Sequence, residues 1–139
     1  TQDRMLSGKH FSILLMRWDP VNHIVSYANA GHCEPLLLSG TRPGFRTNGE
    51  FPVGLRTDTV FHDEILQLAP GEALLLYTDG LTELRSEGGA LSGTDLLVTI
   101  ARESNSVQDL VDSLLAASGR RHFDDDVMVF RLKRDRAVS

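Results

Sequence analysis

The chain has 139 residues, of which 41% are hydrophobic and 24% charged, a composition that supports one hydrophobic core and a single domain over residues 1–139. Its 19 acidic residues outnumber 14 lysines and arginines, and a net charge of -5 without a basic stripe disfavours nucleic acid as a partner. Cys33 is the only cysteine, no apolar run reaches the ~18 residues of a membrane span, and no signal peptide is visible, so we expect a cytoplasmic domain without membrane contact.

The first part of the chain predicts strands. Residues 10–18 are dense in apolar side chains, residues 19–23 carry turn chemistry, and residues 24–29 are β-branched and aromatic, which together predict a hairpin. Residues 34–40 predict a third strand, with Pro35 tolerated near its start. Residues 39–59 are rich in Gly, Pro, Thr and Asn and predict a long surface connection.

Two further strands are predicted at residues 60–68 and 73–78, and the turn sequence APGE at 69–72 predicts that they form a second hairpin. The periodicity then becomes helical. A helix is predicted over residues 93–103 with Thr94 as its N-cap, and a second one starts at a capping-box-like Ser106 and ends at Gly119. The apolar faces consist of Leu96, Leu97, Ile100 and Ala101 in the first helix, and Leu110, Val111, Leu114 and Leu115 in the second.

The last predicted strand covers residues 124–133, and the tail from residue 134 onward is expected to fray. Consecutive antiparallel strands, two helices and a final strand indicate an α+β fold. Regular βαβ alternation is absent from this order, so a Rossmann-like sheet is disfavoured.

Acidic residues stand at two of the predicted strand boundaries. Asp79 and Gly80 follow the apolar run 73–78, and Asp124, Asp125 and Asp126 precede the last strand. If these strands are neighbours, the acids meet at one end of a sheet, where their mutual repulsion requires a cation. Oxygen ligands favour magnesium or manganese over zinc, and a glycine lets the backbone approach such an ion or its waters.

Each motif taken alone is more often a turn or a solvated loop, so that interpretation stays open. The histidines at positions 10, 23, 62 and 122 have no ligand spacing, which argues against zinc. Nothing marks Cys33 as an activated thiolate, and we expect it to be an ordinary core or loop residue.

Four motifs resemble, in order and spacing, the bacterial SpoIIE-type (RsbU-like) branch of the PPM metal-dependent serine/threonine protein phosphatases. They are YANAGHCEPLLL (27–38), PVGL (52–55), PGEALLLYTDGLTE (70–83) and FDDDVMVFRL (123–132). The resemblance implies layered antiparallel β-sheets flanked by helices and a binuclear manganese or magnesium centre. It also implies hydrolysis of phosphoserine or phosphothreonine, often on an anti-sigma-factor antagonist, by a water held between two cations ~3.5–4 Å apart.

Carried over by position, Asp79 and Asp125 match the metal-binding aspartates of the family, and Asp126 is the neighbour that assists. Gly80 belongs to the same metal-site motif and also has a structural interpretation. Asn29, Gly31 and His32 match a family signature that we interpret as turn architecture. The resemblance identifies neither the general acid nor any substrate-binding residue.

This sequence departs from the family in three places. The N-terminal Gly-Asp motif, whose acids bridge the two metals, has no counterpart and is expected upstream of residue 1. The chain is therefore expected to be the C-terminal portion of the domain and to be inactive alone. Met128 stands where the family commonly has Thr, and Cys33 stands where it has Pro or a polar residue.

Two alternatives compete with this interpretation. A haloacid-dehalogenase-like phosphatase would have a nucleophilic Asp where Tyr77 stands, and its βαβ order is absent, so this class is disfavoured. A catalytically incomplete, phosphatase-like module that binds a regulatory partner is the stronger alternative, because the N-terminal acids are missing. The presence of Asp79 and Asp125 argues against such a module, because a protein that only binds a partner has no physical reason to keep two metal-ligand candidates.

Overall fold

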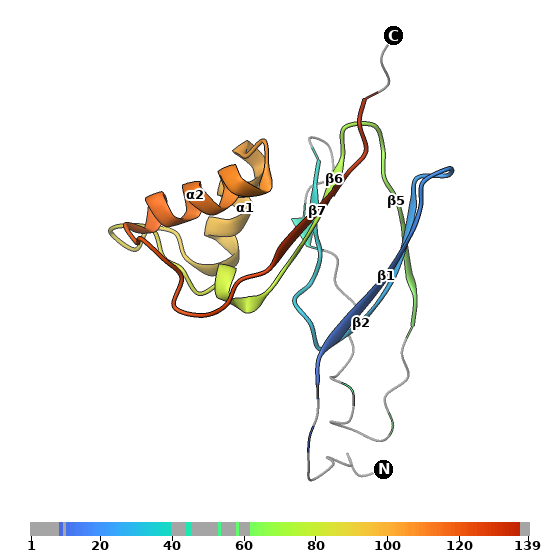
Figure 1. The fold of residues 1–139 in the computed structure, drawn as a ribbon, viewed down its shortest axis with the longest axis horizontal. Helices are drawn as coiled ribbons and strands as arrows, with labels where there is room; N and C mark the ends of the chain where they lie inside the picture. Colours follow the sequence, from blue (N-terminus) through green and yellow to red (C-terminus); the bar gives the residue numbers. More distant parts are fainter. Residues whose placement is uncertain are drawn as a thin grey trace.

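The structure, a computed structural model, describes residues 9, 11–39, 44–45, 53, 58 and 62–136. Within these residues, two antiparallel sheets and two α-helices form three layers (Figure 1). The helices form one outer layer, the sheet that contains β6 (Ala73–Tyr77) and β7 (Val129–Lys133) lies in the middle, and the other sheet forms the opposite outer layer. Neither helix in the described residues has the length and apolar character of a membrane span.

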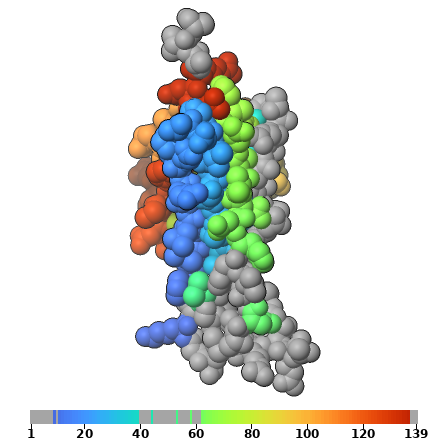
Figure 2. All heavy atoms as spheres, turned by 90° about the vertical axis from the view of Figure 1, so that its right-hand side faces the viewer, coloured from blue at the N-terminus to red at the C-terminus, as the bar shows by residue number. Residues whose placement is uncertain are grey.

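The outer sheet has the strand order β1-β2-β5, with β1 (Ile13–Asp19), β2 (Ile24–Ala30) and β5 (Glu64–Gln67). The predicted hairpin of residues 10–18 and 24–29 is confirmed, because β1 and β2 pair antiparallel from Ile13↔Ala30 to Asp19↔Ile24. The Asp19 carboxylate closes the turn by accepting hydrogen bonds from the backbone N–H of Val21 and Asn22, at 3.0 and 3.1 Å. Figure 2 shows the outward face of this sheet, where the three strands run side by side.

The middle sheet has the order β4-β3-β6-β7, with β3 (Leu36–Leu38) and β4 (Gly44–Phe45) completing it. The strand β4 lies within the predicted surface connection 39–59, most of which falls outside the described residues. The predicted hairpin of residues 60–68 and 73–78 is wrong, because β5 pairs with β2 whereas β6 pairs with β3 and β7.

The physical reason for this error lies in the turn at residues 69–72. Turn chemistry indicates that the chain reverses, but it does not decide whether the flanking strands share hydrogen bonds. Leu66 and Leu68 on one side of the turn and Leu74 on the other pack into one core between the sheets. The chain therefore crosses from one sheet to the other at this turn.

The middle sheet is buried on both faces, which explains the continuous apolar run ALLLY of β6. Between the sheets lies a core of Val25, Tyr27, Leu37, Leu66, Leu68 and Leu74. On the other face, the strand residues Leu36, Leu38, Ala73, Leu75 and Tyr77 pack against the helix residues Leu96, Leu97, Ala101, Leu110 and Leu114. Successive strand residues alternate between the two cores, as a pleated strand requires.

The helices α1 (Gly93–Glu103) and α2 (Val107–Ser118) cover the middle sheet. The prediction of Thr94 as N-cap is wrong, since α1 is preceded by Ser92 and the N–H of Gly93 is already bonded to the carbonyl of Leu84. The capping signal at Ser106 is confirmed, because its side chain accepts a hydrogen bond of 3.0 Å from the N–H of Asp109. Gly119 ends α2 in the left-handed conformation at φ 66°, as predicted.

The chain after α2 departs from prediction at both ends of its strand. The strand predicted over 124–133 begins at Val129, so the three aspartates lie in the preceding loop. The tail does not fray at residue 134, because Arg134 exchanges backbone hydrogen bonds with Gly71 and Glu72 and donates a side-chain bond to the carbonyl of Leu68. Residues 137–139 lie outside the described residues.

Candidate metal centre

The end of β6 and the beginning of β7 lie side by side at one end of the middle sheet. Their register places Tyr77 opposite Val129. Two hydrogen bonds extend the pairing by one residue: the N–H of Thr78 donates to the carbonyl of Met128 at 3.1 Å, and the N–H of Met128 donates to Oγ1 of Thr78 at 2.9 Å. The chain segments that carry Asp79 and Asp125 therefore leave the sheet next to each other.

Gly80 lies where these two segments touch. It is buried in the short helix η1 (Asp79–Leu81), and a Cβ atom at this position would lie 2.8 Å from Cγ2 of Val127 and 3.2 Å from the carbonyl oxygen of Asp126. The carbonyl oxygen of Asp125 would lie 3.8 Å away. A side chain would thus separate the segments, so glycine permits the close approach of the two backbones.

The aspartates after α2 have different partners. Asp124 forms an ion pair with Arg120, and both side chains are exposed. Asp125 and Asp126 are both exposed. The Oδ1 of Asp125 accepts a hydrogen bond of 2.7 Å from the N–H of Asp126. Among the described residues, no Lys, Arg or His forms an ion pair with Asp79, Asp125 or Asp126. Their negative charges are therefore uncompensated within this part of the protein.

Cys33 contacts the candidate metal ligand Asp79, a role that the sequence did not reveal. Its Sγ donates a hydrogen bond of 2.7 Å to Oδ1 of Asp79. Burial, followed by this hydrogen bond and the carboxylate charge, raises the pKa of the Cys33 thiol to about 12. The thiol therefore stays protonated well above neutral pH, and it orients one oxygen of the carboxylate.

The contact follows from the pairing of β3 with β6. Leu36 lies opposite Leu75, so the residues just before β3 run alongside the residues just after β6. The contact between Cys33 and Asp79 could be predicted only from this register, and the register is known only from the tertiary structure. Thr78, which holds β6 to Met128 through its hydroxyl group, was missed for the same reason.

The turn before Cys33 is built as the sequence predicts. The buried Asn29 side chain accepts a hydrogen bond from the N–H of His32 at 2.9 Å and donates one to the His32 carbonyl at 3.1 Å. Gly31 adopts φ 71°, the left-handed conformation expected of it. The Nδ1 atom of His32 lies 3.2 Å from the carbonyl oxygen of Cys33. This contact fits a structural role for His32.

These side chains alone do not complete a metal centre. Within the described ranges, no three His, Cys, Asp or Glu residues gather closely enough to hold an ion. The donor chemistry nevertheless fits a hard divalent cation, because the candidate ligands are carboxylates. A cavity of about 450 Å³ borders the loop that carries Asp125 and Asp126, and its other walls are Val107, Val111, Phe123, Val127 and Val129.

Comparison with known proteins identifies the family of this chain. Residues 1–135 match the family model of Stage II sporulation protein E (SpoIIE). The chain is 30% identical over 120 residues to Protein IcfG of Synechocystis sp., an alignment that covers 80% of the chain and 19% of that protein. The chain thus spans about a fifth of the curated relative that it matches.

Solved structures agree with this assignment. The RsbU and RsbW domains of Rv1364c from Mycobacterium tuberculosis match with a TM-score of 0.66 and 26% identity, over 91% of this chain and 37% of that one. The SiaA-PP2C domain of Pseudomonas aeruginosa matches with a TM-score of 0.67 and 22% identity, over 89% and 52% of the two chains.

The phosphatase domain of the cell fate determinant SpoIIE from Bacillus subtilis (Mn presoaked) matches with a TM-score of 0.66 and 15% identity, over 92% and 58%. The predicted fold, two antiparallel sheets with helices in the arrangement of PPM phosphatase domains, is therefore confirmed. The resemblance seen in the four sequence motifs is confirmed too, and the chain belongs to the SpoIIE family.

Proposed function

We propose that the protein containing this chain is a metal-dependent protein serine/threonine phosphatase in which Asp79 and Asp125 hold a divalent cation. Asp126 assists them, and Gly80 keeps the two ligand segments together with its backbone close to the ion. The observation that carries this proposal is the adjacency of the two segments, across β6 and β7, together with carboxylates that have no cationic partner among the described residues.

The chemistry of these residues supports manganese or magnesium. Neighbouring carboxylates repel each other in the absence of a cation, and bound divalent cations supply an activated water and stabilise phosphoryl oxygens. The chain's own contribution is to orient the ligands: Cys33 directs one oxygen of Asp79, and the N–H of Asp126 directs one oxygen of Asp125. Related structures support the same metals, since one is described as soaked with manganese and that of RsbX as a complex with magnesium.

The substrate we propose is a phosphorylated anti-sigma-factor antagonist, in cytoplasmic signalling. Support comes from family membership and from the 26% identity to a protein described by its RsbU and RsbW domains. The side chains described here cannot form a complete centre, so we propose that this chain alone binds divalent metal weakly and does not release phosphate. Further acidic ligands from the parent protein would complete the site.

A second candidate is a phosphatase-like module that binds a regulatory partner without turnover. The observation that favours it is the lack of a three-residue metal-binding group within the described part of the chain. The two candidates differ in what a change at Asp79 does to turnover, since a binding module has none to lose.

The test compares Asp79→Asn with wild type in the full-length protein. The substitution keeps the size of the side chain and removes its charge, so we expect manganese-dependent release of phosphate from a phosphoserine protein to fall by at least ~100-fold, the upper range for residues that only orient a metal ligand. The variant should fold, because loss of one like charge relieves repulsion in the metal-free protein. Its thermal midpoint without metal should be unchanged or raised.

Asp124→Asn is the matched control. It makes the same chemical change in the same acidic region, but Asp124 is already paired with Arg120. We expect turnover close to that of wild type. Near-normal turnover of the Asp79 variant would remove this residue from the metal site, a collapsed midpoint would assign it a structural role, and an inactive full-length wild type would favour the binding module.

A further inference from the structure

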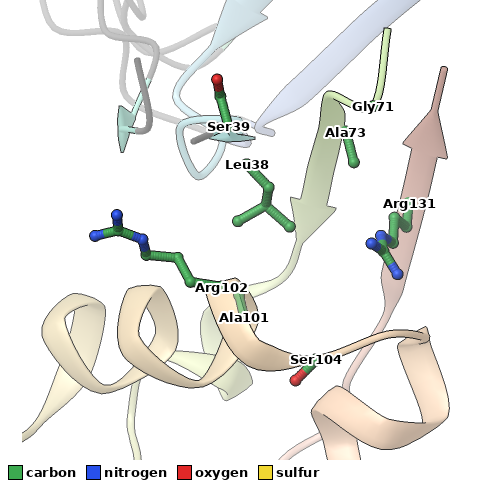
Figure 3. A pocket seen from close by; sticks show the side chains of 8 residues that line it. All are labelled: Leu38, Ser39, Gly71, Ala73, Ala101, Arg102, Ser104 and Arg131. Carbon is green, nitrogen blue, oxygen red and sulfur yellow. The ribbon is translucent and has the colours of Figure 1, made fainter. Parts of the chain in front are cut away.

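A polar cavity of about 330 Å³ opens at the end of β6 that lies away from Asp79. It is lined by Leu38, Ser39, Gly71, Ala73, Ala101, Arg102, Ser104 and Arg131 (Figure 3). Ala73 is the first residue of β6, whereas Asp79 follows its last residue, so the length of the strand separates this cavity from the candidate metal centre. The cavity plays no part in the function proposed above.

The charge of the cavity is positive. Arg102 from α1 and Arg131 from β7 line it, and none of the described residues that line it is acidic. A third arginine, Arg136, packs on the lining residue Gly71, where an added Cβ would lie 3.0 Å from its Nε. Among the described residues, neither Arg102 nor Arg131 forms an ion pair. This concentration of cations contrasts with the chain's net charge of -5.

Arg131 is incompletely satisfied. Its Nη1 donates a hydrogen bond of 2.7 Å to the carbonyl of Asn105, which anchors the guanidinium beneath the connection between α1 and α2. Its Nε is buried and has no hydrogen-bond partner. A buried donor without an acceptor costs free energy, and the cost is larger on a permanently charged group. Figure 3 shows Arg131 and Arg102 on different sides of the cavity, from β7 and α1.

We propose that this cavity binds a small oxyanion through Arg131, with Arg102 and Arg136 supplying further positive charge. A guanidinium presents Nε and its terminal nitrogens as a fork that matches two oxygens of a phosphate or a carboxylate. The anion would meet the Arg131 guanidinium where this side chain lines the cavity, and a shift of the side chain on binding would bring the buried Nε to an oxygen of the anion. The volume has room for roughly ten water molecules, so a phosphate fits together with part of its hydration shell.

The test uses the full-length protein with EDTA, which excludes binding through a metal. Inorganic phosphate is titrated at constant ionic strength, with chloride as the balancing anion, while the thermal midpoint and the heat of binding are measured. We expect phosphate to raise the midpoint of wild type above its value in chloride. Acetate, titrated in parallel, distinguishes a carboxylate ligand from a phosphate: the anion that binds more tightly identifies the ligand class.

Arg131→Gln should weaken binding at least about tenfold, because the fork is lost. Arg131→Lys keeps the charge but loses the fork, so it should also weaken binding. It serves as the test if the glutamine variant does not fold. Arg17→Gln, which removes one positive charge from the outer sheet, is the matched control and should bind like wild type. Equal affinity in wild type and the Arg131 variants, or no anion effect on wild type beyond that of chloride, would overturn the proposal.

Discussion

Gly80→Ala should destabilise the protein although it adds only one methyl group. The new Cβ would lie 2.8 Å from Cγ2 of Val127 and 3.2 Å from the carbonyl oxygen of Asp126. Carbon atoms in contact prefer ~3.5–4.0 Å, so the Val127 side chain or the backbone of residues 125–127 must move. The movement would separate the two segments proposed to carry the metal ligands.

The size of the effect follows from two opposing terms. Overpacking a well-packed site typically costs about 1–3 kcal/mol. Replacing glycine by alanine restricts the unfolded chain and returns about 0.4–1 kcal/mol. We therefore expect the free energy of unfolding to fall by about 0.5–2 kcal/mol, which for a chain of this size lowers the thermal midpoint by about 2–8 °C.

A double-mutant cycle with Val127→Ala isolates the contact. Urea unfolding is measured for wild type, both single variants and the double variant, all without metal. Val127→Ala removes the methyl group that the new Cβ would meet, so Gly80→Ala should cost less in that background. We expect a coupling free energy of at least about 0.5 kcal/mol between the two positions.

Two outcomes would refute the reasoning. If Gly80→Ala leaves the free energy of unfolding unchanged, the close approach of residues 80 and 125–127 is not tight. If the loss is the same whether position 127 holds the native valine or the substituted alanine, its cause is not the Val127 contact. In this second case the cost would lie with the carbonyl oxygen of Asp126, which the Val127 substitution leaves in place.

Three further predictions test the surroundings of the candidate centre and the helix layer. The pKa of Cys33 is raised to about 12 from 9.0, so the contribution of the protonated thiol to stability is complete below about pH 9 and is lost as the pH rises toward 12. Iodoacetamide should therefore label Cys33 slowly at pH 8.5 and faster in the Asp79→Asn variant, and mass spectrometry measures both rates. Asn29→Ala removes both hydrogen bonds of the buried amide and should lower the free energy of unfolding by about 1–3 kcal/mol in urea titrations. Ser106→Ala removes the N-cap of α2 and should cost about 1 kcal/mol, whereas Ser106→Gly should cost only a few tenths by the same measurement.

The elements of the fold could largely be predicted from local sequence. Apolar runs and a β-branched, aromatic segment predicted the strands other than β4, and the capping signals of Ser106 and Gly119 marked both ends of α2. These features depend on residues a few positions apart, which interact in any context. The family could be predicted as well, because its motifs are short segments that keep their order and spacing.

The arrangement of strands was not available from local signals. The turn at residues 69–72 was assigned correctly as a reversal, yet only tertiary packing placed β5 and β6 in different sheets. The local sequences of β5 and β6 are equally compatible with pairing in one sheet and with pairing in two, because either arrangement buries their leucines. The choice is made by the partners β2, β3 and β7, which lie far away along the chain.

For the candidate site, the sequence by itself determined the residue types: a carboxylate after one strand, carboxylates in the segment before another, and a glycine next to the first carboxylate. The tertiary structure decided which atoms meet. It placed Gly80 against residues 125–127, brought Cys33 to Asp79, and buried Arg131 Nε without a partner. The reason is that these contacts depend on strand register, and a register is set by the packing of whole faces rather than by any residue within the contact.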